Sequence, residues 1–280
     1  MAKIKVAELF YSIQGEGRYM GVPSIFLRTF GCNFTCGGFN MPQGQCSKEA
    51  DTIAERVDQF KFYHELPLTS TGCDSYASWH PAFKHLSDTY DTDSIAESII
   101  KLLPYKAWRD EHLVITGGEP LLGWQRAYPE LLDHTLMVNL KEVTFETNGT
   151  QPLSDDFKRY LFVKFSNDKQ RLTFSVSPKL SVSGETWDNA IKPEIVASYQ
   201  WYGHTYLKFV VATEDDVAEA IQATSEYRDA GFTGPVYLMP VGGVENVYSM
   251  NNRQVAELAM TYGLRYSDRL QMLWKNEWGK

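Results

Sequence analysis

The chain has 280 residues, of which 43% are hydrophobic and 14% aromatic, so it can bury a sizeable core as one large domain or two small ones. Its formal net charge of −8 and the lack of a basic stripe argue against a nucleic-acid partner and favour a small-molecule ligand. The N-terminal residues lack the apolar core of a signal peptide, no stretch is long enough to span a bilayer, and four cysteines are too few for a disulfide scaffold. We therefore expect a soluble cytoplasmic protein without a membrane partner, whose clustered thiols serve a metal or catalysis.

Short runs rich in β-branched and aromatic residues predict strands along most of the chain. In chain order they cover residues 24–30, 113–116, 142–147, 172–177, 206–211 and 236–239. Apolar residues recur with helical spacing between several of these runs, which predicts helices there.

Three of the predicted helices have clear markers in the sequence. Thr92 or Asp93 can cap the first. Val217, Ala220 and Ile221 mark the apolar side of the second. The third stops at Gly263.

The alternation of strands and helices predicts an α/β fold with a mainly parallel sheet, in a single domain over residues 1–280. About six such strands are enough for a partial, incomplete TIM-type barrel but not for a closed one. Ligands are then expected at the carboxyl ends of the strands.

Residues 37–92 interrupt this alternation, because they are rich in Gly, Ser, Asp and aromatic residues and have little periodic apolar pattern. We interpret the segment as an insertion. Its aromatic residues, such as Phe60, Phe62 and Tyr63, are expected to pack it against the barrel rather than to stack on a ligand.

Cys32 and Cys36 form a C-x3-C pair in the loop after the first predicted strand. Such a pair begins a thiolate site for iron, and three cysteines on a 4Fe–4S cluster leave one iron open for a ligand that can be activated. No cysteine follows Cys36 by two residues, so the third ligand is either Cys46 or Cys73. A four-thiolate zinc site uses the same residue types, although its cysteines usually come in short pairs.

A second motif, Thr116-Gly117-Gly118-Glu119-Pro120, follows the next predicted strand directly. The two glycines let the backbone approach a ligand closely, and Glu119 supplies an acceptor for an ammonium group. Taken alone, the same run is equally well a tight turn into a helix.

Together, the C-x3-C pair and the Gly-Gly-Glu run resemble the radical S-adenosylmethionine enzymes. Further runs resemble one family among them, the 7-carboxy-7-deazaguanine synthases, in the order in which that family has them. These runs are residues 10–17, 21–28, 31–33, 116–122, 146–150, 175–180 and 207–211. The resemblance covers nearly the whole chain outside residues 37–72, which it implies to be an insertion in the cluster-binding loop of a radical S-adenosylmethionine core.

The resemblance implies a lyase that converts 6-carboxy-5,6,7,8-tetrahydropterin to 7-carboxy-7-deazaguanine with loss of ammonia, as in queuosine-type 7-deazaguanine biosynthesis. A reduced 4Fe–4S cluster would cleave S-adenosylmethionine, and the resulting 5′-deoxyadenosyl radical would take hydrogen from the pterin. No side chain is then expected to be catalytic by its own chemistry. The family also implies Mg²⁺, a homodimer, and an electron donor such as flavodoxin or ferredoxin.

In that family the third cluster cysteine is followed by Asp and then Thr or Ser. The resemblance therefore implies Cys32, Cys36 and Cys73 as cluster ligands, with Cys46 a spare thiol inside the insertion. Ser75 stands where the family has a hydroxyl that binds Mg²⁺.

Arg28 offers a fork of donors suited to a carboxylate, and strand alternation places it on the face opposite Leu27. The resemblance implies a substrate-binding set of Ile13, Gln14, Gly15, Glu16, Arg28 and Thr116. It implies a cofactor-binding set of Gly117, Gly118, Glu119, Glu146, Asn148, Ser177, Pro178, Lys179, Met239 and Pro240.

Two features depart from the family pattern. Met239 replaces a glutamine that often contacts the adenine end of the cofactor, and residues 268–275 lack the usual Gln-Thr-His-Lys ending. Two other classes remain as alternatives: another radical enzyme, such as a glycyl-radical activating enzyme, and a non-enzymatic zinc-binding module.

Overall fold

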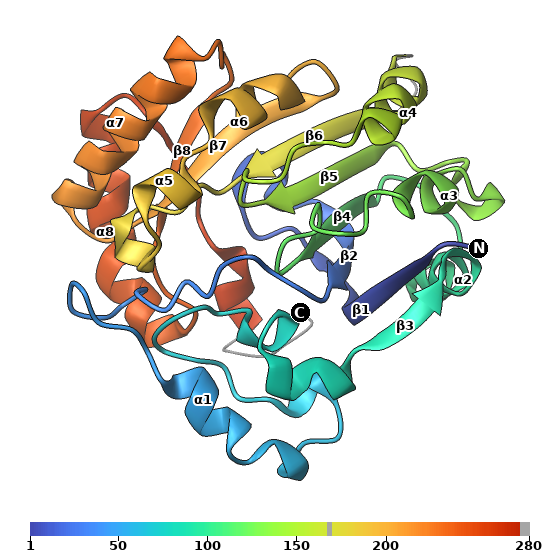
Figure 1. Cartoon of the computed structure of the whole chain (residues 1–280), viewed down its shortest axis with the longest axis horizontal. Coiled ribbons are helices and arrows are strands. Elements are labelled where there is room, and N and C mark those ends of the chain that lie inside the picture. The colour runs from blue at the N-terminus through green and yellow to red at the C-terminus, as the bar shows by residue number, and fades with distance from the viewer. Residues whose placement is uncertain (167–169, 275–280) are drawn as a thin grey trace.

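In the computed structural model, which describes residues 1–166 and 170–274, a nine-stranded sheet runs through the centre of the protein (Figure 1). The strands are β1 (Lys3–Ile13), β2 (Pro23–Thr29), β3 (Asp88–Asp91), β4 (His112–Gly117), β5 (Glu142–Thr147), β6 (Arg171–Val176), β7 (His204–Val211), β8 (Val236–Pro240) and β9 (Arg265–Tyr266). Their order across the sheet is β3-β1-β2-β4-β5-β6-β7-β8-β9, so β3 and β9 form two free edges and the sheet is not closed.

Neighbouring strands in the row β2-β4-β5-β6-β7-β8-β9 pair in parallel, and β1 runs antiparallel to both of its neighbours, β2 and β3. All of the strands predicted from the sequence are confirmed. No strand was predicted at β1, β3 or β9. Of these, β3 exposes three of its four residues and β9 has only two, so neither carries a clear buried pattern. Such short or exposed strands form because a neighbour offers a free edge, which local pattern does not reveal.

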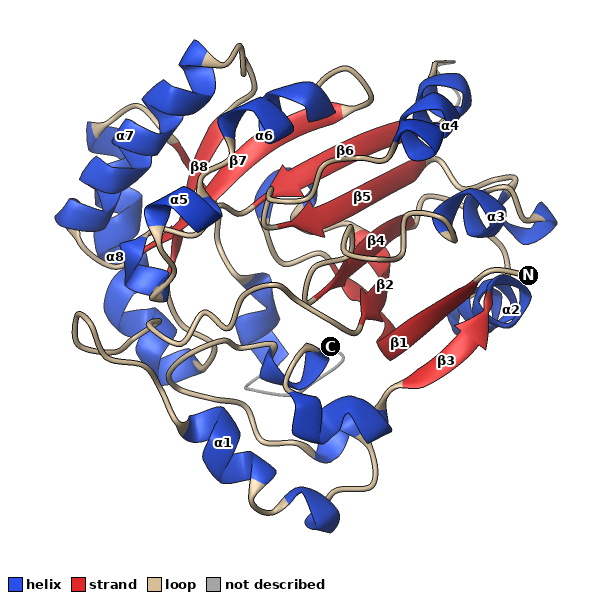
Figure 2. Cartoon of the chain, viewed as in Figure 1, coloured by secondary structure: helices blue, strands red, loops and turns tan. Residues whose placement is uncertain are grey.

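Eight α-helices connect or flank these strands in the described residues (Figure 2). They are α1 (Glu49–Ala54), α2 (Thr92–Leu102), α3 (Tyr128–Leu132), α4 (Asp155–Phe165), α5 (Trp187–Ala190), α6 (Pro193–Tyr199), α7 (Glu214–Asp229) and α8 (Glu245–Thr261). Short 3-10 helices cover Gly17–Tyr19, Val57–Gln59, Tyr63–Glu65, Tyr76–Ser78, Pro81–Leu86, Thr135–Met137, Ser181–Ser183 and Leu270–Trp274. None of the described helices is both long and apolar enough to cross a membrane.

The three helices with sequence markers are confirmed as α2, α7 and α8, with two corrections. On α7, Val217 and Ala220 are buried, but Ile221 is 41% exposed and does not belong to the apolar side. Asp91, rather than Thr92 or Asp93, caps α2, because its side chain accepts a hydrogen bond from the backbone N–H of Ser94 at 2.8 Å. The hydroxyl of Thr92 donates instead to Glu130. Gly263 follows α8 with a φ of +65°, in keeping with the predicted stop.

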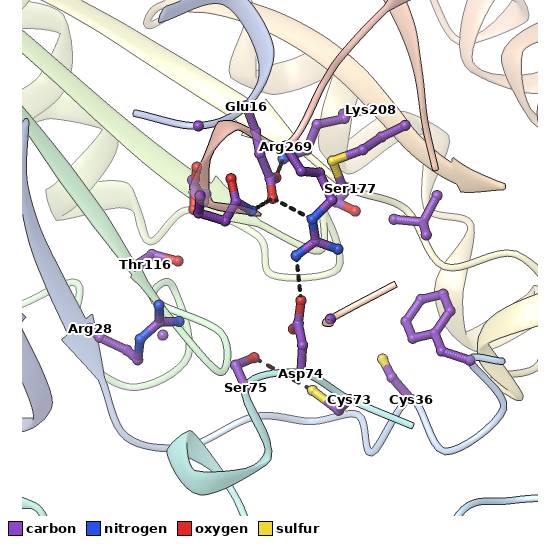
Figure 3. A pocket seen from close by; sticks show the side chains of 18 of the residues that line it. Glu16, Arg28, Cys36, Cys73, Asp74, Ser75, Thr116, Ser177, Lys208 and Arg269 are labelled. Carbon is purple, nitrogen blue, oxygen red and sulfur yellow. Dashed lines mark hydrogen bonds and ion pairs between the residues drawn. The ribbon is translucent and has the colours of Figure 1, made fainter. Parts of the chain in front are cut away.

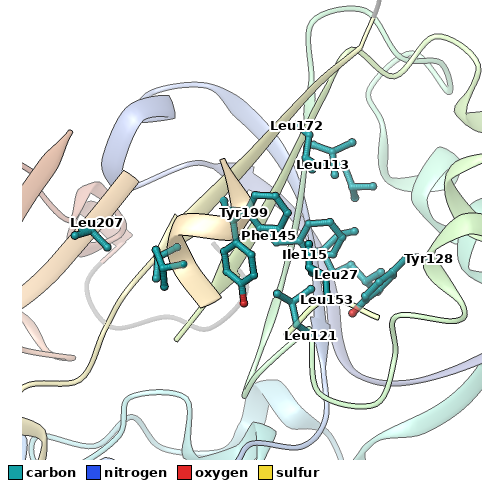
Figure 4. Close-up of a cluster of buried hydrophobic side chains, with 14 of the residues drawn as sticks. Leu27, Leu113, Ile115, Leu121, Tyr128, Phe145, Leu153, Leu172, Tyr199 and Leu207 are labelled. Carbon is teal, nitrogen blue, oxygen red and sulfur yellow. The ribbon is translucent and has the colours of Figure 1, made fainter. Parts of the chain in front are cut away.

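One face of the sheet and the helices outside it enclose the main hydrophobic core (Figure 4). Alternate strand residues such as Leu27, Ile115 and Phe145 point into this core, and each is fully buried. The ring of Phe145 lies 5.1 Å from that of Tyr128 on α3 and 5.9 Å from that of Phe157 on α4. The strand residues between these core positions point to the opposite face of the sheet, away from the helices, and they include most of its polar side chains.

The predicted insertion, residues 37–72, contains α1, which lies in the lower part of Figure 1 away from the helices that cover the sheet. A second hydrophobic cluster packs this segment against β1 and the following 3-10 turns, and it includes Tyr63 and, at its margin, Phe60. The expectation for these two aromatic residues is confirmed. It is wrong for Phe62, which is 58% exposed and stacks on His64 instead.

We expect Phe145→Ala to lower the free energy of unfolding by about 3–5 kcal/mol, because it empties a buried ring-sized space. Urea denaturation followed by circular dichroism would measure the change. Phe162→Ala on α4 is the matched control, since Phe162 is 63% exposed and should cost little. Equal losses for the two variants would contradict this description of the core.

Candidate functional site

A pocket of about 300 Å³ lies at the carboxyl ends of the strands, on the face opposite the main core (Figure 3). Most residues expected at a site line it: Ile13, Gln14, Gly15, Glu16, Arg28, Cys32, Cys36, Cys73, Ser75, Thr116, Gly117, Gly118, Glu146, Asn148, Ser177, Lys179 and Met239. Glu119, Pro178, Pro240 and Cys46 do not line it. Strand alternation accounts for the sheet positions among them, since Arg28 enters the pocket while Leu27 enters the core.

Three thiols meet at one end of the pocket. Cys32, Cys36 and Cys73 pack in one small cluster with Phe34, and all are free of disulfides. Cys46 is exposed and lies outside this cluster. The structure thus brings together the three cysteines expected as ligands and leaves the fourth apart.

The loop that carries Cys32 and Cys36, the thiol loop, is held in place by a residue from a distant segment of the chain. Cys36 has a φ of +48°, a left-handed conformation that a non-glycine residue adopts only when its surroundings favour it. The backbone N–H groups of Thr35 and Cys36 both donate to Oε1 of Glu185, at 3.0 and 2.8 Å. Glu185, which follows β6, therefore fixes the shape of the loop after β2.

Burial keeps these thiols protonated in the protein alone. It raises the pKa of Cys32 to about 12 and also raises the pKa values of Cys36 and Cys73. A bound metal would displace these protons, because thiolates are the form that binds. No three His, Cys, Asp or Glu side chains within residues 1–166 and 170–274 converge on a point suited to a single metal ion.

The two glycines after β4 lie against the thiol loop. A Cβ on Gly118 would stand 2.4 Å from the carbonyl oxygen of Gly31 and 2.7 Å from Cβ of Cys32. On Gly117, where φ is +151°, it would stand 2.4 Å from the carbonyl oxygen of Thr29. Only glycine fits at both positions, so this wall of the pocket is bare backbone.

Glu119 lies behind that wall rather than in it. Its carboxylate is fully buried and accepts hydrogen bonds from the hydroxyl of Thr147 at 2.7 Å and from the backbone N–H groups of Asn148 at 2.7 Å and Leu121 at 3.0 Å. Burial raises the pKa of Glu119 to about 6 despite these donors. In the protein alone, Glu119 ties the loop after β4 to the loop after β5.

The loop after β5 is tied in turn to the thiol loop. The Asn148 side-chain amide donates to Oδ1 of Asn33 at 2.9 Å, and the Asn33 amide donates to the hydroxyl of Thr150 at 3.0 Å. On the neighbouring loop after β6, the ammonium group of Lys179 donates to the hydroxyl of Ser177 at 3.2 Å. These polar groups surround the pocket on the side of the thiols.

Arg28 faces the middle of the pocket beside Thr116 (Figure 3). Its Nε pairs with Oε2 of Glu8 on the adjacent strand β1 at 3.2 Å. Burial would lower the pKa of Arg28, but Tyr63 and Glu8 outweigh it and raise the pKa. The guanidinium stays charged in a part of the molecule with little water.

Glu16 stands at the other end of the pocket, inside a buried network of charges (Figure 3). It pairs with Lys208 of β7, lies 3.3 Å from Nε of Arg269, and accepts from the amide of Gln271 at 2.6 Å. Burial alone would raise the pKa of Glu16, but the charges of Lys208 and Arg269 lower it to about 2. The carboxylate is ionised at every physiological pH.

Gln14 links this network to β5. Its side-chain amide donates to Oε1 of Glu146 at 3.0 Å, and its Oε1 accepts the backbone N–H of Glu16 at 3.2 Å. Gln14 is buried, whereas Ile13 beside it is 37% exposed at the pocket rim.

Sequence reasoning missed several polar residues at this site: Glu8, Asp74, Glu185, Lys208, Arg269 and Gln271. Lys208 had a local signal, because a lysine within the apolar strand 206–211 needs a buried partner. Arg269 and Gln271 come from the C-terminal segment for which no substrate contact was predicted, and part of that segment, Lys275, lies outside the described residues.

Comparison with known proteins shows relatives along nearly the whole chain, although no family model matches it. A protein of Halobacterium salinarum named 7-carboxy-7-deazaguanine synthase is 30% identical over 298 aligned residues, which cover 98% of this chain and 91% of that protein. One of the same name from Pyrobaculum aerophilum is 28% identical over 282, covering 99% and 98%. The crystal structure of QueE from Escherichia coli shares the fold, with a TM-score of 0.55, 18% identity and coverage of 95% and 93%.

The ion pairs of Glu16 predict a specific pH dependence of stability. A carboxyl whose folded pKa is depressed from 4.5 to about 2 stabilises the protein above pH 4.5 and loses that contribution as the pH falls toward 2. Glu16→Gln should therefore be less stable than wild type by about 3 kcal/mol near neutral pH, and this gap should close in acid. Urea titrations of the metal-free protein at several pH values would measure the gap.

Glu97→Gln is the control for this series, because Glu97 is 62% exposed and, among the residues that the structure describes, forms an ion pair only with Lys101 on the same helix. Its stability should stay within about 0.5 kcal/mol of wild type throughout. A gap for Glu16→Gln that did not change with pH would contradict the buried charge network.

Proposed function

The chain belongs to the 7-carboxy-7-deazaguanine synthase family, and from this premise we propose that it forms 7-carboxy-7-deazaguanine from 6-carboxy-5,6,7,8-tetrahydropterin, with ring contraction and loss of ammonia. The observation that carries the proposal is one pocket with three free thiols at one end and a charged, hydrogen-bonding set around Arg28 and Glu16 at the other. A radical enzyme needs its cofactor and its substrate in contact, and a shared pocket at the carboxyl ends of parallel strands supplies that.

The sheet corresponds to the incomplete barrel of the radical S-adenosylmethionine core, in a single domain with residues 37–72 inserted in the cluster loop. Support comes from the lining of the pocket, which takes Phe10 and Ser12 from β1 as well as Met239 from β8. Strands so far apart in the sheet can line one pocket only if the sheet is curved.

Cys32, Cys36 and Cys73 would hold the 4Fe–4S cluster, and Cys46 would not. Three thiols and no fourth are what a cluster with one open iron requires. When bound, the cluster and S-adenosylmethionine supply the electron and the carbon radical that removes hydrogen from the substrate. The protein's part is to hold these groups and keep water from them.

The loops after β4, β5 and β6 would hold S-adenosylmethionine next to the thiols. Gly117 and Gly118 offer bare backbone, and the side chains of Asn148, Ser177 and Lys179 offer donors and acceptors. Other positions of the predicted set act differently: Met239 lines the pocket with an apolar side chain, and Glu146 reaches it beside Gln14. Glu119 supports the wall from behind, and Pro178 and Pro240 do not line the pocket.

Arg28 would bind the carboxylate of the pterin, because its Nε is taken by Glu8 and the end of the guanidinium faces the pocket. Thr116 lies beside it. Charge pairing of this kind orients the reacting carbon without taking part in bond making.

The heterocyclic edge of the pterin would lie against Ile13, Gln14, Gly15 and Glu16, and Gln271 extends this set. The Gln271 amide must turn its N–H₂ group toward the Glu16 carboxylate, which fixes the position of its Oε1. That oxygen is buried without a hydrogen-bond partner among the described residues, and Gln271 lines the pocket, so an N–H of a bound pterin would supply the missing donor.

Ser75 would help to hold Mg²⁺, with substrate oxygens and water completing the shell. Its hydroxyl lines the pocket 3.5 Å from Sγ of Cys73. We extend the family's homodimer and its electron donor, a flavodoxin or ferredoxin, to this chain. Free cysteines suit the reducing cytoplasm.

The cluster assignment predicts a contrast between two cysteines. After anaerobic reconstitution, Cys73→Ala should lose the bound iron, sulfide and visible absorbance, because it removes a ligand. Cys46→Ala should keep all three at the wild-type level, although Cys46 is nearer to Cys36 in the sequence. The reverse pattern, or tightly bound zinc without iron in the wild type, would overturn the assignment.

The reaction itself is tested by anaerobic incubation with carboxytetrahydropterin, S-adenosylmethionine, a reductant and Mg²⁺, followed by mass analysis. We expect the deazaguanine product with no protein substrate present, which excludes a glycyl-radical activating enzyme. Arg28→Lys should raise KM for the pterin about tenfold or more, because a lysine cannot form the paired contact. An intact cluster without product would defeat the substrate assignment.

A further inference from the structure

Arg269 connects two parts of the pocket that are far apart in the chain. Its guanidinium donates to Oδ2 of Asp74 at 2.7 Å and has its Nε 3.3 Å from Oε1 of Glu16 (Figure 3). Asp74 lies between Cys73 and Ser75, and Glu16 lies in the loop expected to bind the pterin. One buried cation, only 9% exposed, thus spans from the thiol end of the pocket to the substrate end.

The two carboxylates depend on Arg269 to different degrees. Glu16 also pairs with Lys208 and accepts from Gln271, so it keeps partners if the guanidinium is removed. Asp74 is 44% exposed and forms no second ion pair within residues 1–166 and 170–274. Loss of Arg269 should therefore release the Cys73–Ser75 turn before it disturbs Glu16.

The other restraints on the turn are uncharged. The hydroxyl of Thr69 donates to the carbonyl oxygen of Cys73 at 3.2 Å, and Gly243 lies so close that an added Cβ would stand 2.9 Å from Cβ of Asp74. The backbone N–H of Gly72 donates to the carbonyl oxygen of Phe39 at 2.8 Å, and the carbonyl oxygen of Ser75 accepts the N–H of Ser78 at 2.9 Å. The charged contact is the strongest of these restraints.

We propose that Arg269 is a positioning residue, which sets the third cluster cysteine and Ser75 at a fixed place relative to the substrate loop by bridging Asp74 and Glu16. The proposal deepens the proposed function and rests on it for the roles of these groups. The C-terminal segment would then affect the reaction without touching the reacting atoms, because it holds the cofactor end and the substrate end of the pocket at a fixed distance and orientation.

The test begins with metal-free protein, in which the reactivity of each thiol can be followed without any cofactor. Brief treatment with iodoacetamide and mass analysis of peptides gives the alkylation rate of Cys73, with exposed Cys46 as the internal standard. In Arg269→Gln the rate at Cys73 should rise about tenfold relative to Cys46, because the turn opens more often. Arg269→Lys, which cannot reach both carboxylates, should give a smaller rise.

Two further variants separate positioning from general loss of stability. Arg265→Gln is the matched control in the same segment, since the guanidinium of Arg265 donates to the hydroxyl of Tyr237 at 2.9 Å and Arg265 lies outside the pocket lining. It should leave the rate at Cys73 unchanged. Asp74→Asn should reproduce the effect of Arg269→Gln on the alkylation rate of Cys73, and the double variant should not raise that rate further, because both changes break the same contact between Arg269 and Asp74.

In the reconstituted enzyme, Arg269→Gln should lower kcat about tenfold or more while S-adenosylmethionine is still cleaved, so that cleavage and product formation become uncoupled. An unchanged Cys73 rate, or an equal rise at Cys32 and Cys73, would overturn the proposal. So would additive effects of Asp74→Asn and Arg269→Gln. If wild type makes no product but the thiol pattern appears, the proposed function fails and the positioning role stands.

Discussion

The buried carboxylate of Glu16 is the interaction on which the rest of the pocket depends. A carboxylate in this position is costly unless it is paired, and it is paired with cations from two distant places, Lys208 in the sheet and Arg269 near the C-terminus. Because each cation comes from a different part of the chain, this pairing joins the loop after β1, strand β7 and the C-terminal segment in the folded protein. The substrate end of the pocket is therefore built by charge rather than by apolar packing.

The thiol end is built differently. Here the thiols, which are neutral in the protein alone, pack against Phe34. Backbone N–H groups of the thiol loop donate hydrogen bonds to the carboxylate of Glu185. Glu119 and Asn148 extend the same scheme to the loops after β4 and β5. A site that must receive a metal cluster gains from this arrangement, because the loops are held while the thiols stay free to lose their protons.

Between these ends, successive residues of a strand point to opposite faces of the sheet, with apolar side chains on the core face and polar side chains on the pocket face. Leu27 and Phe145 pack under the helices, whereas their neighbours Arg28 and Glu146 face the pocket. The same strands thus stabilise the fold with one side chain and shape the site with the next. This is why strand positions in the pocket could be read from periodicity, while the conformations of the loops could not.

The sequence by itself determined the strands with strong β pattern, the amphipathic helices, and the motif residues that gather at the carboxyl ends of the strands, because these follow from local spacing. Only the tertiary structure decided which carboxylates meet which cations: Arg269 pairs with Glu16 near the N-terminus and with Asp74, 195 residues away in the chain, and no local pattern encodes such a distance. It also decided that Glu119 is buried, where it connects the loops after β4 and β5, and that Cys46 is exposed, away from the other thiols. Burial and long-range pairing arise from the packing of the whole chain, so the residues that hold the pocket together were the ones that sequence spacing left unassigned.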